Sequence, residues 1–278
     1  MTASPPESPR SAAEPRTRNR LLAALPADEY ARLAPHLERV TLQSKDVLFD
    51  VERPITHVYF PEALLGSVVS VMADGSAVET ATVGREGMVG LPVFLGTDRT
   101  NAQALVQVPG PALRMSADAL RAAVGDSPAL ARGLQHYTQA LFTLVAQGSA
   151  CNRLHAMPER CARWLLHTQD RVGGDEFPLT HQFLSQMLGV RRATVTEAMG
   201  ALQERGVVDY QMGRVRVRDR AGLEAAACEC YAIIVREFDR LLGEEPPGRP
   251  PPPDPLAGVT TAEGGRSALG DGAGGSER

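Results

Sequence analysis

The 278-residue chain, with 43% hydrophobic and 22% charged residues, is long enough to bury one or two cores, and ordinary domain sizes favour two. Its four cysteines are too few and too unevenly spaced for a disulfide framework, which suits a reducing compartment. The net charge of −4 argues against a uniformly basic protein, and no segment resembles a signal peptide or a membrane span. We therefore expect a cytoplasmic protein with no membrane partner.

The two ends of the chain have the composition of tails. Residues 1–18 are rich in Ser, Pro, Ala and Arg, and residues 243–278 are rich in Pro and Gly, so both ends are predicted to be disordered. Five leucines after the first tail recur at roughly helical spacing around Pro26 and predict two short capping helices. These are Leu21, Leu22, Leu25, Leu33 and Leu37.

Short β-branched stretches separated by turn residues follow, from Val40 to about Leu113. Asp74-Gly75 stands between two of them and favours a tight hairpin of the primed type, which needs positive φ. Several strands at this spacing are typical of a small barrel or jelly roll. The sequence therefore predicts a β-roll with a helical cap over residues 19–126.

A long helix is predicted over residues 127–156. Its apolar residues follow steps of four and three along a predicted seam, which consists of Leu130, Leu134, Tyr137, Leu141 and Leu144, continued by Gly148 and Cys151. Such a stripe can pair with a second chain or pack on the chain's own barrel. Because the stripe is narrow and flanked by Gln and Arg, we favour pairing, and the sequence predicts a homodimer.

Residues 157–221 carry the strongest local motif. Thr180 is placed to cap a short helix that ends before Gly189, and a second helix is expected from about Arg192 to Gln203. Two helices joined so tightly predict a helix-turn-helix, whose second helix enters the major groove of DNA. The predicted DNA contacts on the two helices are Thr180, Gln182, Arg191, Arg192, Thr194 and Thr196.

Two alternating strands are predicted around Met212-Gly213, and they would form a wing beside the two helices. Arg214, Arg216 and Arg218 would share one face of the second strand, where DNA phosphates are the natural partner, although a solvated strand also carries such charges. From Leu179 to Arg220 the chain has seven arginines against four carboxylates, a net charge of +3 within an acidic protein. A last helix is predicted over residues 222–242.

The cysteines are interpreted as structural. Cys228-Glu229-Cys230 could hold a metal, but no second pair of Cys or His stands near it in the sequence. Neither a metal nor a cofactor is therefore expected.

In this order, the elements over residues 20–220 resemble the cyclic-AMP receptor/fumarate-nitrate regulator (Crp/Fnr) family. The resemblance is carried by the turn Gly84-Arg85-Glu86-Gly87-Met88-Val89-Gly90-Leu91, the strand Val58-Tyr59-Phe60, and the stretch from Leu179-Thr180 through Gly189-Val190-Arg191-Arg192-Ala193-Thr194-Val195. It implies an α+β fold: a cyclic-nucleotide-binding-like β-roll, a long dimerisation helix and a C-terminal winged helix-turn-helix. It also implies a non-enzymatic transcription regulator that acts as a dimer on a palindromic site, with double-stranded DNA and RNA polymerase as partners.

The resemblance also bears on the effector. In that family a Glu in this turn binds the ribose, and an Arg-Ser/Thr pair holds the cyclic phosphate. Met88 stands at the Glu position here, so we expect an effector other than cyclic AMP. The pocket candidates are Arg85, Glu86, Met88, Arg99 and Thr100, and Arg99 can also be read as a solvated loop residue.

Other interpretations remain open. The chain could be a cyclic-nucleotide-responsive regulator with a degenerate site, or an effector-independent interaction module. His57 or His136 could bind haem, whereas an N-terminal iron–sulfur cluster is disfavoured because no cysteine precedes Cys151. An enzymatic β-roll is disfavoured because His57 is the one histidine between residues 40 and 113.

Overall fold

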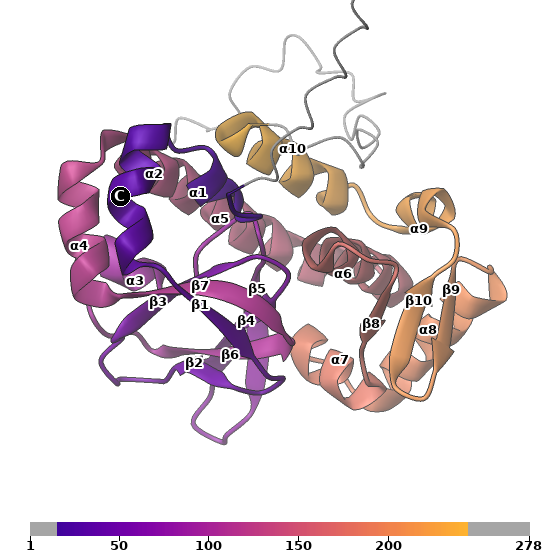
Figure 1. Ribbon diagram of the computed structural model, residues 1–278. Helices are drawn as coiled ribbons and strands as arrows, with labels where there is room; N and C mark the ends of the chain where they lie inside the picture. Colours follow the sequence, from indigo (N-terminus) through magenta and orange to yellow (C-terminus); the bar gives the residue numbers. More distant parts are fainter. Residues whose placement is uncertain (1–15, 244–278) are drawn as a thin grey trace, which may run out of the picture.

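The computed structural model of the protein describes residues 16–243 (Figure 1). Most of the two predicted tails lies outside the described residues. The predicted disorder of residues 1–18 is wrong at the C-terminal end of this tail, because Thr17 is buried and its hydroxyl donates a hydrogen bond to Glu62 Oε1 at 3.1 Å. Asn19 then caps the first helix and donates to Pro61 O and Gly87 O, which ties this segment to the β-roll.

The β-roll follows the predicted order of helical cap and strands. The cap consists of α1 (Arg20–Ala23), α2 (Ala27–Leu33) and the 3-10 turn η1 (Ala34–His36). The strands are β1 (Glu38–Leu42), β2 (Val47–Phe49), β3 (His57–Pro61), β4 (Leu65–Val71), β5 (Ala77–Val83), β6 (Ala102–Val108) and β7 (Gly110–Ser116). They form two antiparallel sheets with the orders β1-β7-β3 and β2-β6-β4-β5. Val58, Phe60 and Val106 lie in the core between them, because the β-branched and aromatic side chains of the strands point inward at period two, and Met88 joins them from the turn after β5.

The hairpin at Asp74-Gly75 is confirmed, since it joins β4 to β5. The prediction of a primed turn is wrong, because Gly75 is the only residue of the turn with a positive φ, at 81°. Met72 pairs with Ser76 across a three-residue loop, and Asp74 Oδ1 accepts hydrogen bonds from the backbone N–H and hydroxyl of Ser76. These side-chain bonds hold the longer loop.

Three helices follow or interrupt the strands: α3 (Leu91–Phe94), α4 (Ala117–Asp126) and the long helix α5 (Pro128–Leu154). Ser127 caps α5 by accepting the N–H of Leu130, and Pro128 occupies its first position. No helix in residues 16–243 is both long enough and apolar enough to cross a membrane.

The predicted dimer seam on α5 faces the chain's own core, so its assignment to a dimer interface is wrong. Leu130, Leu134, Tyr137 and Leu144 are buried within one chain, and Leu141 is half-buried against the same core. The Tyr137 ring packs so closely on Gly87 that the glycine position has no room for a Cβ. The stripe is therefore covered by the β-roll and by the last helix of the chain.

The C-terminal part contains helices, a three-stranded sheet and two closing helices. Its elements are α6 (Met157–Val172), β8 (Glu176–Pro178), α7 (His181–Leu188), α8 (Arg192–Glu204), β9 (Val208–Gln211), β10 (Arg214–Val217), α9 (Arg220–Ala226) and α10 (Cys230–Leu242). The strand order is β8-β10-β9. The single helix predicted over residues 222–242 is two helices, because the chain turns between α9 and α10. Figure 1 shows α10 returning along α5, and its Phe238 ring lies edge-on to Tyr137 with 6.5 Å between centroids.

Candidate nucleic-acid interface

The helix-turn-helix forms where the sequence predicts it. Thr180 Oγ1 accepts the N–H of Phe183 at 3.1 Å, and Gly189 adopts the left-handed conformation at φ 63° directly after α7. Both the predicted cap and the predicted glycine end are thus confirmed. Ser185 is buried, and its backbone carbonyl accepts the N–H of Val190 at 3.0 Å, which closes the turn.

Helix α8 is amphipathic and is held on one side only. Its residues Val195, Ala198, Met199 and Leu202 are buried against the core that α6 also enters. Arg191, Arg192 and Thr196 are exposed, and Thr194 is half-buried. The first turn of α8 therefore presents two guanidinium groups and a hydroxyl to solvent, which suits base and phosphate contacts.

His181 also belongs to this surface, although no sequence motif points to it. Its Nδ1 lies 3.0 Å from Thr196 Oγ1, and its ring stacks on Tyr210 at 4.2 Å. The Thr196 hydroxyl donates to Arg192 O, so His181 Nδ1–H acts as the donor to Thr196. Burial, reinforced by Arg192, lowers the pKa of His181, which favours the neutral ring and positions Thr196 on α8.

The wing is present, and its arginines lie on one face. Met212 and Gly213 both have positive φ, 48° and 74°, as a type I′ turn requires. Arg214 and Arg216 both pair with Glu176. Their hydrogen bonds lower the pKa of Glu176, and the one from Arg214 has the larger effect. Arg218 pairs with Asp209. Exposed pairs of this kind contribute little, so phosphates can compete for these arginines.

The β4–β5 hairpin lies beside the helix-turn-helix. A Cβ on Gly189 would come within 3.1 Å of Val78 Cγ2, so β5 packs directly on the turn between α7 and α8. An open groove runs between the hairpin, near Met72 and Ser76, and the two helices, near Gln182 and Arg192. Gln182 is exposed in this groove, and Thr180 is exposed at the start of α7.

The effector candidates do not form one pocket, so that prediction is wrong as a grouping. Met88 is buried in the β-roll core, and the half-buried Arg85 accepts the N–H of Arg20 with its backbone carbonyl. Arg99 is exposed and donates to Glu52 O at 3.2 Å, while Thr100 Oγ1 accepts the N–H of Ala102. Arg99 thus fits the solvated-loop interpretation.

Glu86, the remaining candidate, joins the two halves of the molecule. Its Oε1 accepts a hydrogen bond from Arg171 Nε at 2.7 Å, and both side chains are less than 10% exposed. Burial raises the pKa of Glu86, but Arg171 and the N–H of Gly84 outweigh it, so the net shift of that pKa is downward. The turn that resembles a nucleotide-binding motif therefore holds α6, the helix that leads into the helix-turn-helix.

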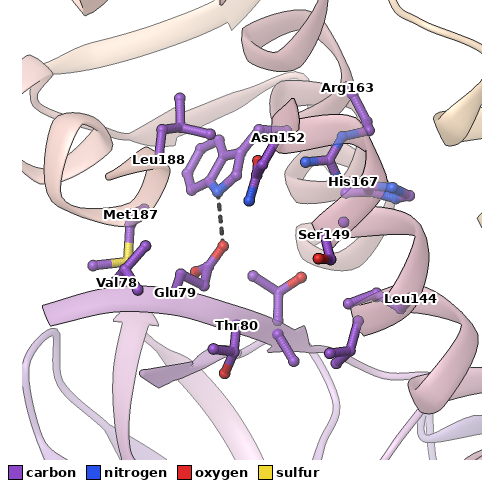
Figure 2. Close-up of a pocket in the computed structure, with 15 residues that line it drawn as sticks. Val78, Glu79, Thr80, Leu144, Ser149, Asn152, Arg163, His167, Met187 and Leu188 are labelled. Carbon is purple, nitrogen blue, oxygen red and sulfur yellow. Dashed lines mark hydrogen bonds between the residues drawn. The ribbon is translucent and has the colours of Figure 1, made fainter. Parts of the chain in front are cut away.

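A second polar contact joins the halves at a cavity of about 330 Å³ between β5, α5, α6 and α7 (Figure 2). Trp164 Nε1 donates to Glu79 Oε1 at 2.9 Å, the bond that is dashed in Figure 2. The Ser67 hydroxyl lies 2.6 Å from Glu79 Oε2 and 2.7 Å from Gln107 Oε1. One hydroxyl proton serves only one of these oxygens, so the second donor is either a proton on Glu79 or the amide of Gln107, whose Nε2 has no other partner among the described residues. Burial raises the pKa of Glu79 to about 7, against the hydrogen bonds from Ser67 and Trp164.

The raised pKa of Glu79 predicts that this group makes the folded protein less stable as pH rises from 4.5 to about 7. Between pH 4.5 and about 7 the folded protein keeps a proton on Glu79 that the unfolded chain releases, so the free energy of unfolding should fall through that window. The loss should be on the order of 2–3 kcal/mol. Glu79→Gln should remove it, whereas Asn at the exposed Asp118 should leave it. Urea unfolding across this pH window measures the effect, and equal pH dependence in wild type and Glu79→Gln would contradict it.

Comparisons with known proteins show which class of protein this geometry is similar to. Residues 159–226 match the family model of the Crp-like helix-turn-helix domain. FixK2 from Bradyrhizobium japonicum has 17% identity and a TM-score of 0.59, with 69% of this chain and 97% of that chain covered. The c-di-GMP responsive regulator CLP of Xanthomonas campestris has 15% identity and a TM-score of 0.56, with 69% and 99% covered. A CRP-family regulator from Thermus thermophilus has 18% identity and a TM-score of 0.54, with 68% and 96% covered. A search of curated protein sequences gives no match.

The fold and the matched domain define a helix-turn-helix protein with a β-roll at its N-terminal side. Residues 159–226 are thus similar to the Crp-like helix-turn-helix family, and the fold of the described residues is similar to that of solved Crp/Fnr structures, in line with the resemblance of the sequence motifs. The matched helix-turn-helix domain favours a regulator over the enzymatic interpretation of the β-roll.

Proposed function

We propose that the protein binds a palindromic DNA site as a homodimer in the cytoplasm, with α8 of each subunit in the major groove. The observation that carries this proposal is the exposed first turn of α8, with Arg191, Arg192 and Thr196, within a domain that matches the Crp-like helix-turn-helix. The resemblance to the family adds RNA polymerase as a partner. The wing arginines would contact phosphates on either side of the groove.

The dimer would form through a face of α5 that neither the β-roll nor α10 covers. Phe142 is 68% exposed, and Val145 lies one turn further along the same face. Thr138, Phe142 and Val145 follow steps of four and three, the spacing of a coiled-coil seam, and Ser149 and Asn152 continue it along the rim of the cavity in Figure 2. Since a single chain leaves the apolar side chains of Phe142 and Val145 in water, a second copy of α5 is their natural partner.

Two substitutions separate base reading from phosphate contact. Arg192→Ala should cost about 1–3 kcal/mol at one operator position, because a guanidinium in the major groove pairs with a particular base edge. Arg216→Ala should weaken binding to all sequences alike and reduce the salt slope by about one. DNA fragments selected from a random pool, followed by gel shifts at several salt concentrations, measure both effects.

If Arg192→Ala weakened binding to all DNA sequences equally, α8 would lie outside the major groove. An unchanged salt slope in Arg216→Ala would leave that arginine with Glu176 instead of DNA. Ala at the exposed Arg132, on α5 and away from the interface, is the control and should change neither quantity.

The effector site is best placed in the cavity shown in Figure 2. Its size suits a small ligand, and it lies where the β-roll, α5 and the DNA-binding part meet, so occupancy would act on their arrangement. Arg163 lines the cavity and brings the positive charge of its guanidinium to the wall (Figure 2). A guanidinium in this position favours a ligand with an acidic group.

Cyclic AMP does not fit as the effector. Met88 offers a weak thioether acceptor where the family's turn offers a carboxylate, and Glu86 is already held by Arg171 and Gly84. An unpaired ribose hydroxyl would cost about 1–3 kcal/mol, a tenfold to hundredfold loss of affinity. Titration calorimetry with cyclic AMP and cyclic GMP should therefore show no micromolar binding. Micromolar binding that also tightens operator affinity would contradict this expectation.

A further inference from the structure

Four potential metal ligands meet where α5 ends and α10 begins. Cys151 and His155 come from the end of α5, and Cys228 and Cys230 flank Glu229 at the start of α10. Their ligand atoms all lie within 4.8 Å of one another. The three cysteines are buried and the histidine is half-buried. The tertiary fold thus supplies the second pair of ligands that the sequence does not place beside Cys228-Glu229-Cys230.

The local structure aims each pair at the other. Cys151 and His155 are four residues apart, so they lie on one face of the helix. The N–H of His155 still bonds to Cys151 O at 3.1 Å while its backbone is already extended. Cys228 and Cys230 approach from the turn between α9 and α10. Each pair is short-range, and their meeting joins residues 77 positions apart.

The spacing is that of ligands around one ion. Cys151 Sγ lies 3.5 Å from Cys228 Sγ, and Cys230 Sγ lies 3.5 Å from His155 Nδ1. In a tetrahedral zinc site, bonds of about 2.3 Å to sulfur and about 2.0 Å to nitrogen put neighbouring ligand atoms about 3.5–3.8 Å apart. A disulfide needs about 2.05 Å between sulfurs. All four cysteines of the chain are free thiols in the structure.

The outer contacts also fit a metal. His155 Nε2 lies 3.2 Å from Glu229 Oε1, which leaves Nδ1 directed at the thiols. Histidines that bind metals usually donate their other ring N–H to a carboxylate in this way. Gln147 Nε2 donates to Cys230 Sγ at 3.1 Å, as it would to a thiolate. Three thiolates and one divalent cation leave a net charge of −1, which the nearby Arg160 guanidinium helps to balance.

We propose that Cys151, His155, Cys228 and Cys230 bind one Zn²⁺ in a closed tetrahedral site. Three thiol protons leave to solvent as the three Zn–S bonds form, and the neutral Nδ1 of His155 supplies the fourth bond. Sulfur and imidazole ligands select zinc over magnesium or calcium. Four protein ligands leave no open position for substrate, so the site is structural. The close spacing leaves no room for the iron and sulfide atoms of a cluster.

Zinc at this position would fasten α10 onto α5. The ion joins the end of α5 to the turn before α10, and from there Phe238 packs on Tyr137 and Leu241 O bonds to His136 Nδ1. Because the unfolded chain does not hold this site preformed, binding energy becomes folding energy for this end of the molecule. Loss of zinc would loosen α10 and uncover the part of the buried Leu130–Leu144 stripe that α10 covers.

Metal analysis of the full-length protein, purified without chelator, tests the proposal. We expect one zinc per chain after extensive dialysis. Cobalt exchanged into the site should give the thiolate-to-metal charge-transfer absorption of a sulfur-rich site. Cys228→Ser should lose both the bound zinc and the cobalt charge-transfer absorption. Cys161→Ala is the matched control, because Cys161 is an equally buried thiol in the helix-turn-helix core, outside the cluster, and it should keep both.

A second measurement covers the case in which Cys228→Ser fails to fold. Zinc added back to chelator-treated wild type should protect the cluster thiols from alkylation and raise the melting temperature. A folded wild type that takes up neither zinc nor cobalt overturns the proposal. Equal metal loss in Cys161→Ala, or a Cys151–Cys228 disulfide in place of metal in protein purified under reductant, does so as well.

Discussion

Phe142→Glu should turn the proposed dimer into a monomer. Phe142 is an exposed apolar side chain on the face of α5 proposed to pair, so in that dimer the substitution would place a carboxylate of each subunit in an apolar contact. Operator affinity should then fall by about a hundredfold or more, because each half-site would bind alone. Analytical ultracentrifugation measures the mass, and gel shifts on the selected operator measure the affinity.

The matched control is Leu95→Glu. Leu95 is 59% exposed at the end of α3, so the same charge replaces a similar apolar side chain away from α5, and the dimer should survive. Leu141→Glu is a different experiment, since Leu141 packs on its own chain's core and the change should destabilise the fold. If Phe142→Glu still sediments as a stable dimer, the interface lies elsewhere.

Arg171→Ala should destabilise the protein by about 3–5 kcal/mol, because it leaves the buried carboxylate of Glu86 without its cation. The lowered pKa of Glu86 means that the pair contributes stability above the unfolded pKa and loses it as pH falls through the folded pKa. Denaturant unfolding of wild type and variant at neutral pH measures the loss.

A double variant distinguishes a charge effect from a loss of packing. Glu86→Gln with Arg171→Met keeps the volume and removes both charges, so it should recover much of the stability that Arg171→Ala loses. Arg132→Ala, at an exposed position on α5, should change stability little. A loss below about 1 kcal/mol in Arg171→Ala would mean that water solvates Glu86 and that the pair does not hold the two halves together.

These contacts indicate how the β-roll could act on DNA binding. Glu86 holds Arg171 at the end of α6, Glu79 holds Trp164 two helical turns earlier, and Val78 packs on Gly189 in the turn before α8. Val78 and Glu79 lie on β5, which borders the cavity, and Glu86 lies in the turn that follows β5. A ligand there that favours one arrangement of α6 over another would shift the position of α8.

The sequence by itself determined the elements whose structure depends on neighbouring residues. Thr180 caps α7, Gly189 ends it in the left-handed conformation, and Arg214 and Arg216 alternate with buried Val215 and Val217 on β10. Caps, left-handed glycines and strand alternation depend on the residue and those within a few positions of it. The winged helix-turn-helix and its place after a β-roll and a long helix could therefore be predicted.

Only the tertiary structure decided what each surface meets. The periodicity of Leu130 to Leu144 shows that α5 has an apolar stripe, but the same stripe fits a partner chain or the chain's own β-roll and α10. The sequence motif predicts Glu86 as a pocket residue, but in the tertiary structure Glu86 binds Arg171, which is 85 positions away in the chain. The Cys151–His155 pair is likewise visible in the sequence, but its proximity to Cys228 and Cys230 arises because α10 folds back along α5. Local propensity carries no information about such long-range contacts, which packing of the whole chain sets.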